Sequence, residues 1–213
     1  MRRESSSKRH TPSCDTKDRI VASAMRLFAQ KGYAATSTKE ICGAARADIA
    51  AIHYHFKSKE NLYRHIIEQF ASDHMNKLCQ ILRPPKTRDE FVVRLETFLQ
   101  VSVDSIMQQP ELAKMILRDM ELMTDICKDV FEDTFMKLHK ALISFFTSAK
   151  EGHLLRPGVD PGLATLSFNN QLLFLSQGGG LIKALHGFDI ADNKFRERWL
   201  AHVMDALCFG FLE

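Results

Sequence analysis

The sequence has no apolar run long enough to cross a membrane. A transmembrane helix needs roughly 18 or more consecutive apolar residues, and the charged residues, 26% of the 213, interrupt every apolar stretch before that length. Met1-Arg2-Arg3 is followed by none of the apolar segment found in a secretory signal. We therefore expect a cytoplasmic protein without a membrane partner.

The spacing of the cysteines and histidines lacks the patterns of a disulfide framework or a zinc module. The five cysteines are an odd number and form no C-x-x-C motif. His53 and His55 point roughly 200° apart on a helix, so they cannot share one ion. No Ser/His/Asp, glycine-rich phosphate or paired-carboxylate motif is present. We expect no metal, no cofactor and no enzymatic activity.

The sequence also lacks the apolar/polar alternation of β-strands, and its apolar residues recur at helical spacing, as at Ile20, Ala24 and Phe28. Asp15 and Ser58 are predicted N-caps, and Ser37 with Glu40 forms a capping box. Gly178-Gly179-Gly180 is expected to interrupt a helix. Helices are expected over 15–31, 37–46, 48–56, 59–82, 90–108, 111–123, 125–151, 162–176 and 193–211, with a short helical stretch at 181–186.

Positive charge is concentrated at the front of the chain. Residues 1–60 hold 12 Lys and Arg against 6 Asp and Glu, whereas residues 61–213 hold 17 against 20. Two short helices joined by a turn at residues 46–49 fit a helix-turn-helix, and the basic excess favours phosphate binding. The predicted fold is all-α, with a flexible basic tail (1–14), a three-helix helix-turn-helix DNA-binding domain (15–62) and a larger helical domain (63–213) for ligand binding and dimerisation.

Three motifs match a known family in order and spacing: F-A-Q-K-G-Y at 28–33, S-T-K-E-I at 37–41 and I-H-Y-H-F-K-S-K-E-N-L at 52–62. Residues 15–65 thereby resemble the DNA-binding domain of the TetR family of repressors. The loop at 152–162 and the closing helices resemble regulators of the CecR type. The resemblance implies a small-molecule inducer bound by the larger half and a homodimer formed by the last two helices.

The predicted contacts with double-stranded DNA lie at helix starts and on the third helix. A hydroxyl and a lysine at the start of the second helix suit phosphate oxygens, and small apolar side chains suit a thymine methyl. Lys59, in the first turn of its helix, is placed where the helix dipole favours an anion. The predicted contacts are Thr38, Lys39, Ile49, Ala50, Ala51, His53, Tyr54 and Lys59.

Two departures from the family pattern affect the turn. Arg46 stands where glycine is usual, which predicts a strained backbone or a different turn. Asp48 is expected to use its charge as an N-cap. The third helix has no Arg, Asn or Gln for bidentate base recognition, so we expect DNA shape and the basic tail to contribute to specificity.

The larger half contains the methionine and phenylalanine side chains that suit an adaptable pocket. The predicted pocket residues are Met107, Met120, Met123, Phe135, Phe168 and Asn170. The apolar residues predicted for the dimer interface are Leu166, Leu173, Trp199, Val203, Leu207 and Phe211.

The sequence therefore predicts a ligand-responsive homodimeric transcriptional regulator, a repressor, that binds a palindromic operator. Two-fold symmetry would place two copies of the third helix roughly 34 Å apart, one turn of DNA. One alternative is a DNA-binding architectural or adaptor protein without a small-molecule ligand. The other is a small helical enzyme, which convergent polar groups in the pocket would favour.

Overall fold

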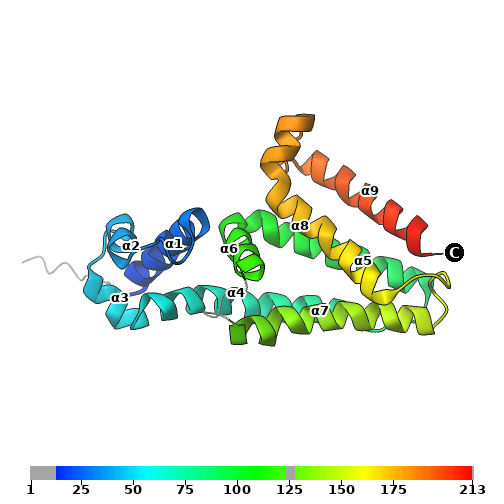
Figure 1. Ribbon diagram of the computed structural model, residues 1–213, viewed down its shortest axis with the longest axis horizontal. Helices are drawn as coiled ribbons and strands as arrows, with labels where there is room; N and C mark the ends of the chain where they lie inside the picture. The colour runs from blue at the N-terminus through cyan, green and yellow to red at the C-terminus, as the bar shows by residue number, and fades with distance from the viewer. Residues whose placement is uncertain (1–12, 123–127, 213) are drawn as a thin grey trace, which may run out of the picture. The chain divides into compact units, whose positions relative to one another are not determined.

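The computed structural model describes residues 13–122 and 128–212, apart from the side chains at 13–15, 70–74, 119–122 and 134. The described ranges contain no strand, so the all-α prediction is confirmed (Figure 1). None of the described helices is both long and apolar enough for a bilayer crossing. The helices are α1 (Ser13–Lys31), α2 (Thr38–Ala45), α3 (Ile49–Phe56), α4 (Lys59–Ile81), α5 (Arg88–Gln108), α6 (Pro110–Leu122), α7 (Lys128–Glu151), α8 (Pro161–His186) and α9 (Asn193–Phe211).

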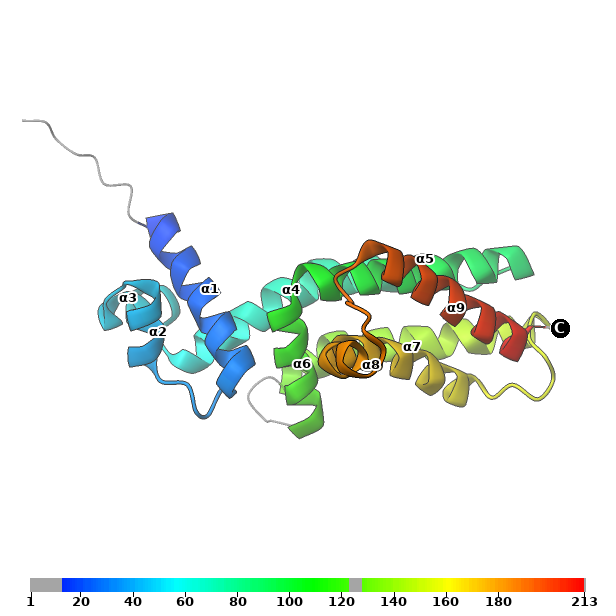
Figure 2. The ribbon, with the colours of Figure 1, turned by 90° about the horizontal axis from the view of Figure 1, so that it is seen from above.

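The chain divides into two compact units between Ile66 and Ile67, within α4 and close to the predicted boundary after residue 62. In the first unit α1 packs against α2 and α3, which also contact each other (Figure 2). Five apolar side chains of this unit, spaced at helical intervals, are almost completely buried and form its small core. They are Phe28, Ile41, Ile52, Phe56 and Leu62.

The second unit is built around α5, α7 and α8. Helix α7 lies along α8, α9 contacts α5, and α5 also contacts α6 and α8. The centre of its core is aromatic: the Phe91 ring stacks on Phe145 at 5.0 Å and meets Phe146 edge-on at 5.8 Å. Such pairs add to the free energy gained by burying the rings.

The predictions for α1 and α8 need correction. Helix α1 begins at Ser13, so Asp15 lies inside its first turn and is not the N-cap. Helix α8 continues through Gly178-Gly179-Gly180, where an interruption was expected. A Cβ at Gly179 would lie 2.6 Å from Ile190 Cδ1, so a larger residue there would require the Ile190 side chain to shift. A glycine inside a helix costs only about 1 kcal/mol relative to alanine, so packing can compensate for it.

Candidate nucleic-acid interface

The turn between α2 and α3 contains an arginine in a left-handed conformation. Arg46 has φ 50° and ψ 50°, values that glycine adopts more easily than residues with a Cβ. The Arg46 N–H donates to the Gly43 carbonyl, and the Ala47 N–H donates to Cys42 O at 3.0 Å. This pair of hydrogen bonds is the Schellman ending of a helix. The strained turn predicted at Arg46 is confirmed.

Helix α3 has a buried face and an exposed face. Ile52 and Phe56 are buried in the first unit, whereas Tyr54 is 75% exposed and Ile49 49% exposed. Ala50 and His53 are exposed as well, and Ala51 is half-buried at the edge of this face. The exposed side chains lie at i, i+1, i+4 and i+5, which places them on one side of a helix.

Asp48 occupies the N-cap position of α3 with extended backbone, as predicted. Its carboxylate, however, makes no capping hydrogen bond among the described residues, so the expectation that its charge is used at the helix start is wrong. The backbone alone begins this helix: the Ala51 N–H donates to Asp48 O at 2.9 Å. The Asp48 carboxylate is exposed beside the turn.

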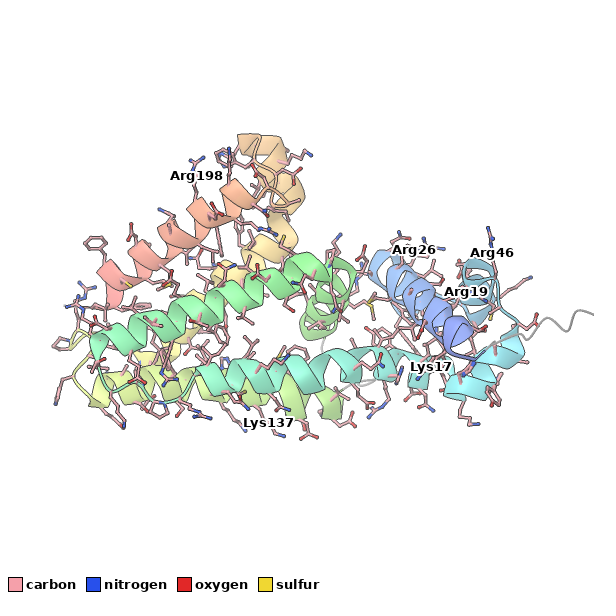
Figure 3. All side chains as sticks on the ribbon, turned by 180° about the vertical axis from the view of Figure 1, so that it is seen from behind. Lys17, Arg19, Arg26, Arg46, Lys137 and Arg198 are labelled. Atoms are coloured by element: carbon pink, nitrogen blue, oxygen red, sulfur yellow. The ribbon has the colours of Figure 1, made fainter. Side chains whose placement is uncertain are left out.

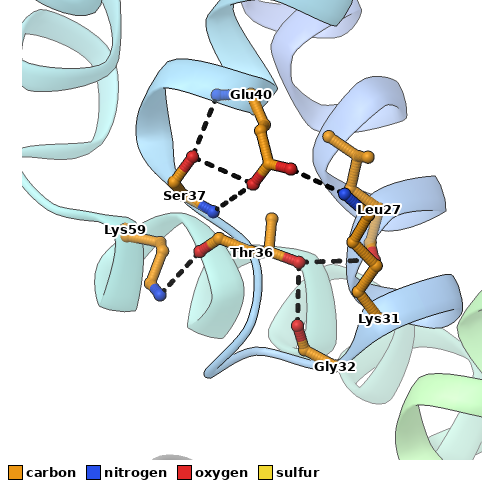
Figure 4. Close-up of polar contacts among 7 residues, drawn as sticks. All are labelled: Leu27, Lys31, Gly32, Thr36, Ser37, Glu40 and Lys59. Carbon is orange, nitrogen blue, oxygen red and sulfur yellow. Dashed lines mark hydrogen bonds and ion pairs between the residues drawn. The ribbon is translucent and has the colours of Figure 1, made fainter.

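The start of α2 is held by the predicted capping box (Figure 4). The Glu40 N–H donates to Ser37 Oγ at 3.2 Å, and the Ser37 N–H donates to Glu40 Oε2 at 2.9 Å. Lys31 Nζ lies 2.6 Å from Glu40 Oε1. The hydrogen bond from Lys31, followed by those from Ser37, lowers the pKa of Glu40 from 4.5 to about 2. These contacts position Thr38, which is half-buried, and Lys39, which is exposed.

Lys59 binds the loop between α1 and α2. Its ammonium donates to Tyr33 O at 2.9 Å and to Thr36 O at 2.8 Å, and it lies 4.1 Å from the centre of the Tyr33 ring. The buried Thr36 hydroxyl donates in turn to Gly32 O at 2.8 Å (Figure 4). Two of the three ammonium protons are therefore used inside the domain. Sequence reasoning assigned Lys59 to a phosphate and missed this structural role.

Two exposed cations at the ends of α3 were not among the predicted contacts. Arg46 precedes the helix and Lys57 follows it, and both are exposed. Lys57 also has a positive φ, 69°. Figure 3 shows the Arg46 side chain directed outward from the turn. The signal in the sequence was a basic residue on each side of an eight-residue helix without Lys or Arg.

The residues predicted for a ligand pocket do not lie together. Phe135 and Asn170 line a hollow of about 680 Å³ between α7 and α8. Phe168 is completely buried and its ring lies 5.5 Å from that of Phe98, so it belongs to the core and its assignment to a pocket is corrected. Met107 packs against the same core. The Met120 side chain and all of Met123 lie outside the described residues.

The predicted dimer interface needs a similar correction. Leu166 is 58% exposed and Leu173 36% exposed on α8. Val203 and Leu207 of α9 are instead buried in the chain's own core, where no second copy can reach them. Trp199 and Phe211 pack against this core too, and the Phe211 ring meets Phe146 edge-on at 5.6 Å. The exposed apolar residues of α8 are Leu163, Leu166, Leu173, Phe174, Leu181 and Leu185.

The described residues contain no cluster of three or more His, Cys, Asp or Glu side chains arranged to hold a metal ion. His55 is half-buried, with its ring packed between Tyr54 and Phe56. Burial raises the pKa of the Cys42, Cys79 and Cys208 thiols. A raised pKa keeps these thiols protonated at neutral pH, which makes them poor nucleophiles.

Comparison with known proteins identifies relatives of both units. Residues 20–66 match the bacterial regulatory proteins of the tetR family. The probable HTH-type transcriptional regulator YttP of Bacillus subtilis is 29% identical over 125 residues, which are 57% of this chain and 58% of YttP. The uncharacterized HTH-type transcriptional regulator YvkB of Bacillus subtilis is 25% identical over 187 residues, 88% of this chain and 92% of YvkB.

The fold of most of the chain also has a solved counterpart. The structure of the ketosteroid transcriptional regulator KstR2 of Mycobacterium tuberculosis matches 92% of this chain and 95% of that protein. The TM-score is 0.75 and the sequence identity is 15%. At this identity the similarity establishes the helical architecture alone.

Proposed function

The chain belongs to the tetR family of bacterial regulatory proteins through its domain at residues 20–66, and we propose that it is a ligand-responsive homodimeric repressor of a palindromic operator. It is a transcriptional regulator with a helix-turn-helix DNA-binding domain. The observation that best supports operator binding is the exposed face of α3, which has an exposed cation, Arg46 or Lys57, beyond each end.

The exposed face of α3 suits the major groove of double-stranded DNA. Ile49, Ala50 and Ala51 present small apolar surface to a thymine methyl, and His53 and Tyr54 continue this face toward the bases or the backbone. Thr38 and Lys39 begin α2, where a hydroxyl and an ammonium can contact phosphate oxygens. We add Arg46 and Lys57 to these contacts, because both are exposed beside the same helix.

Two features of the second unit support the proposals of ligand binding and dimerisation. The hollow between α7 and α8 is lined mainly by apolar side chains and includes Phe135 and Asn170, a composition that suits small organic ligands. The exposed row on α8, with Leu166 and Leu173, is apolar surface that a second copy would cover. A two-fold axis would then direct the two α3 helices at successive major grooves.

Regulation requires that the ligand bind one state of the dimer more tightly than the other. A ligand of equal affinity for both states shifts nothing. We propose that the ligand-bound dimer favours a geometry whose two α3 helices no longer fit successive grooves, so that the operator is released.

Selection of bound sequences from random double-stranded DNA tests this function. The purified full chain should enrich a palindrome whose half-site centres are about 10 base pairs apart, or a multiple of one turn. Lys39→Ala should weaken binding several-fold and reduce the salt dependence of the affinity, since a phosphate contact is lost. Lys114→Ala, an exposed lysine of the second unit, is the control and should leave both unchanged. Absence of any enriched sequence would contradict the proposal.

A further inference from the structure

A small cavity of about 170 Å³ lies in the second unit, among α4, α5, α6, α7 and α8. Its lining is mostly apolar and includes Met75, Phe98, Ile116 and Leu172. The lining residues comprise aliphatic, aromatic, methionine, serine and asparagine side chains, and none of them is charged at neutral pH. An ion bound there would contact apolar side chains and find no counter-charge in the lining.

One polar group of this lining lacks a partner. Ser102 is 7% exposed, and its Oγ is shielded from water without a hydrogen bond to any described residue. A buried serine or threonine in a helix can satisfy its hydroxyl with the carbonyl of the preceding turn. Thr165 does so with Pro161 O at 2.8 Å. A buried unpaired hydroxyl is destabilising, and a ligand can supply the missing hydrogen bond.

Two other polar groups on the wall of the cavity are already engaged. Ser176 Oγ donates to Leu173 O at 2.8 Å, and Asn169 Nδ2 lies 3.4 Å from His139 Nδ1. Ser102 therefore differs from Ser176, although both residues line the same cavity. This difference identifies Ser102 as the group toward which the polar atom of a ligand would turn.

We infer that this cavity binds an uncharged, largely apolar molecule the size of one aromatic ring, whose single hydroxyl pairs with Ser102 Oγ. The size follows from the volume, since a cavity of about 150 Å³ accommodates benzene. The class follows from the lining, which offers apolar contact, a buried hydroxyl without a hydrogen bond at Ser102 and no charge. This inference rests on the proposed ligand-responsive function and specifies the chemistry of the ligand. The cavity adjoins the hollow between α7 and α8, with which it shares Phe135, Asn169 and Leu172.

Calorimetric titration of the DNA-free full chain with phenol, benzene and benzoate tests the class. Phenol should bind about tenfold more tightly than benzene, because it pairs with a hydroxyl that benzene leaves unsatisfied. Benzoate, which has a similar ring but a negative charge, should bind most weakly. Equal affinity for phenol and benzene, or tighter binding of benzoate, would overturn the inference.

Two serine variants locate the effect within the cavity. Ser102→Ala should abolish the preference for phenol over benzene and raise the melting temperature of the unliganded protein, since an unpaired buried hydroxyl is removed. Ser176→Ala is the matched control and should retain the preference, because its hydroxyl is bonded to Leu173 O. Survival of the preference in Ser102→Ala would overturn the assignment.

A parallel measurement of operator affinity separates this inference from the proposed function. If phenol binds through Ser102 but the DNA affinity is unchanged, the result contradicts regulation by this ligand class and still supports the binding site. If the chain binds its operator but has no affinity for phenol or benzene, the result contradicts the binding site and still supports the DNA-binding function.

Discussion

At the scale of single residues, substitution of Lys59 should affect stability, whereas substitution of Lys57 should affect DNA binding. Lys59→Ala should lower the free energy of unfolding by about 1–3 kcal/mol, because two loop carbonyls lose their donor. Lys57→Ala removes an exposed ammonium and should weaken operator binding several-fold with little change in stability. Urea unfolding and salt-dependent DNA titration measure the two effects. A Lys59→Ala variant with unchanged unfolding would contradict the structural role.

The capping box at Glu40 should make the stability of the folded chain depend on pH. The pKa of Glu40 is about 2 in the folded chain, against 4.5 for a glutamate without these contacts, because Lys31 and Ser37 stabilise the carboxylate. The stabilisation is complete above pH 4.5 and is lost as the pH falls toward 2. Glu40→Gln should therefore flatten the acid side of the plot of urea midpoint against pH. Glu132→Gln, an exposed carboxyl in α7, should retain the wild-type fall, since Glu40 remains intact.

At the scale of elements, the two faces of α3 should respond differently to truncation. Tyr54→Ala changes an exposed side chain, so it should lower operator affinity and leave the melting temperature nearly unchanged. Ile52→Ala creates a cavity in the core and should cost about 2–5 kcal/mol of stability. Thermal unfolding and DNA titration of both variants check this division. Loss of stability in Tyr54→Ala would contradict the assignment of the exposed face.

The sequence predicted elements whose signals are local. The predicted capping box of Ser37 and Glu40 begins α2, because such a cap depends on residues within one turn. The role of Lys59 was not predictable in this way, since its partners Tyr33 and Thr36 are 26 and 23 residues away.

Helical spacing also leaves open which surface covers an apolar face. Val203 and Leu207 were predicted for the dimer, yet the chain's own core covers them. An apolar face on α9 has the same periodicity whether a second copy or the chain's own core covers it, so only the tertiary structure distinguishes the two possibilities. Leu166 and Leu173 were predicted by the same reasoning, and their place in a dimer remains a proposal.

At the scale of the whole molecule, the exposed row on α8 predicts self-association. Leu166→Glu should dissociate the dimer, because two-fold symmetry places the new charge in both halves of an apolar interface. Val93→Glu is the control, since Val93 is 59% exposed on α5, outside the proposed interface. Analytical ultracentrifugation should give a monomer for the first variant and a dimer for the second. A dimeric Leu166→Glu would count against this face.

The turn at Arg46 implies a trade-off for anyone engineering this protein. Glycine fits its left-handed backbone with less strain, so a search for thermostable variants would be expected to recover Arg46→Gly. The same change removes an exposed cation beside α3 and with it a proposed phosphate contact. Heat resistance selected at this position would then be obtained at the expense of operator affinity, as is common where strain coincides with function.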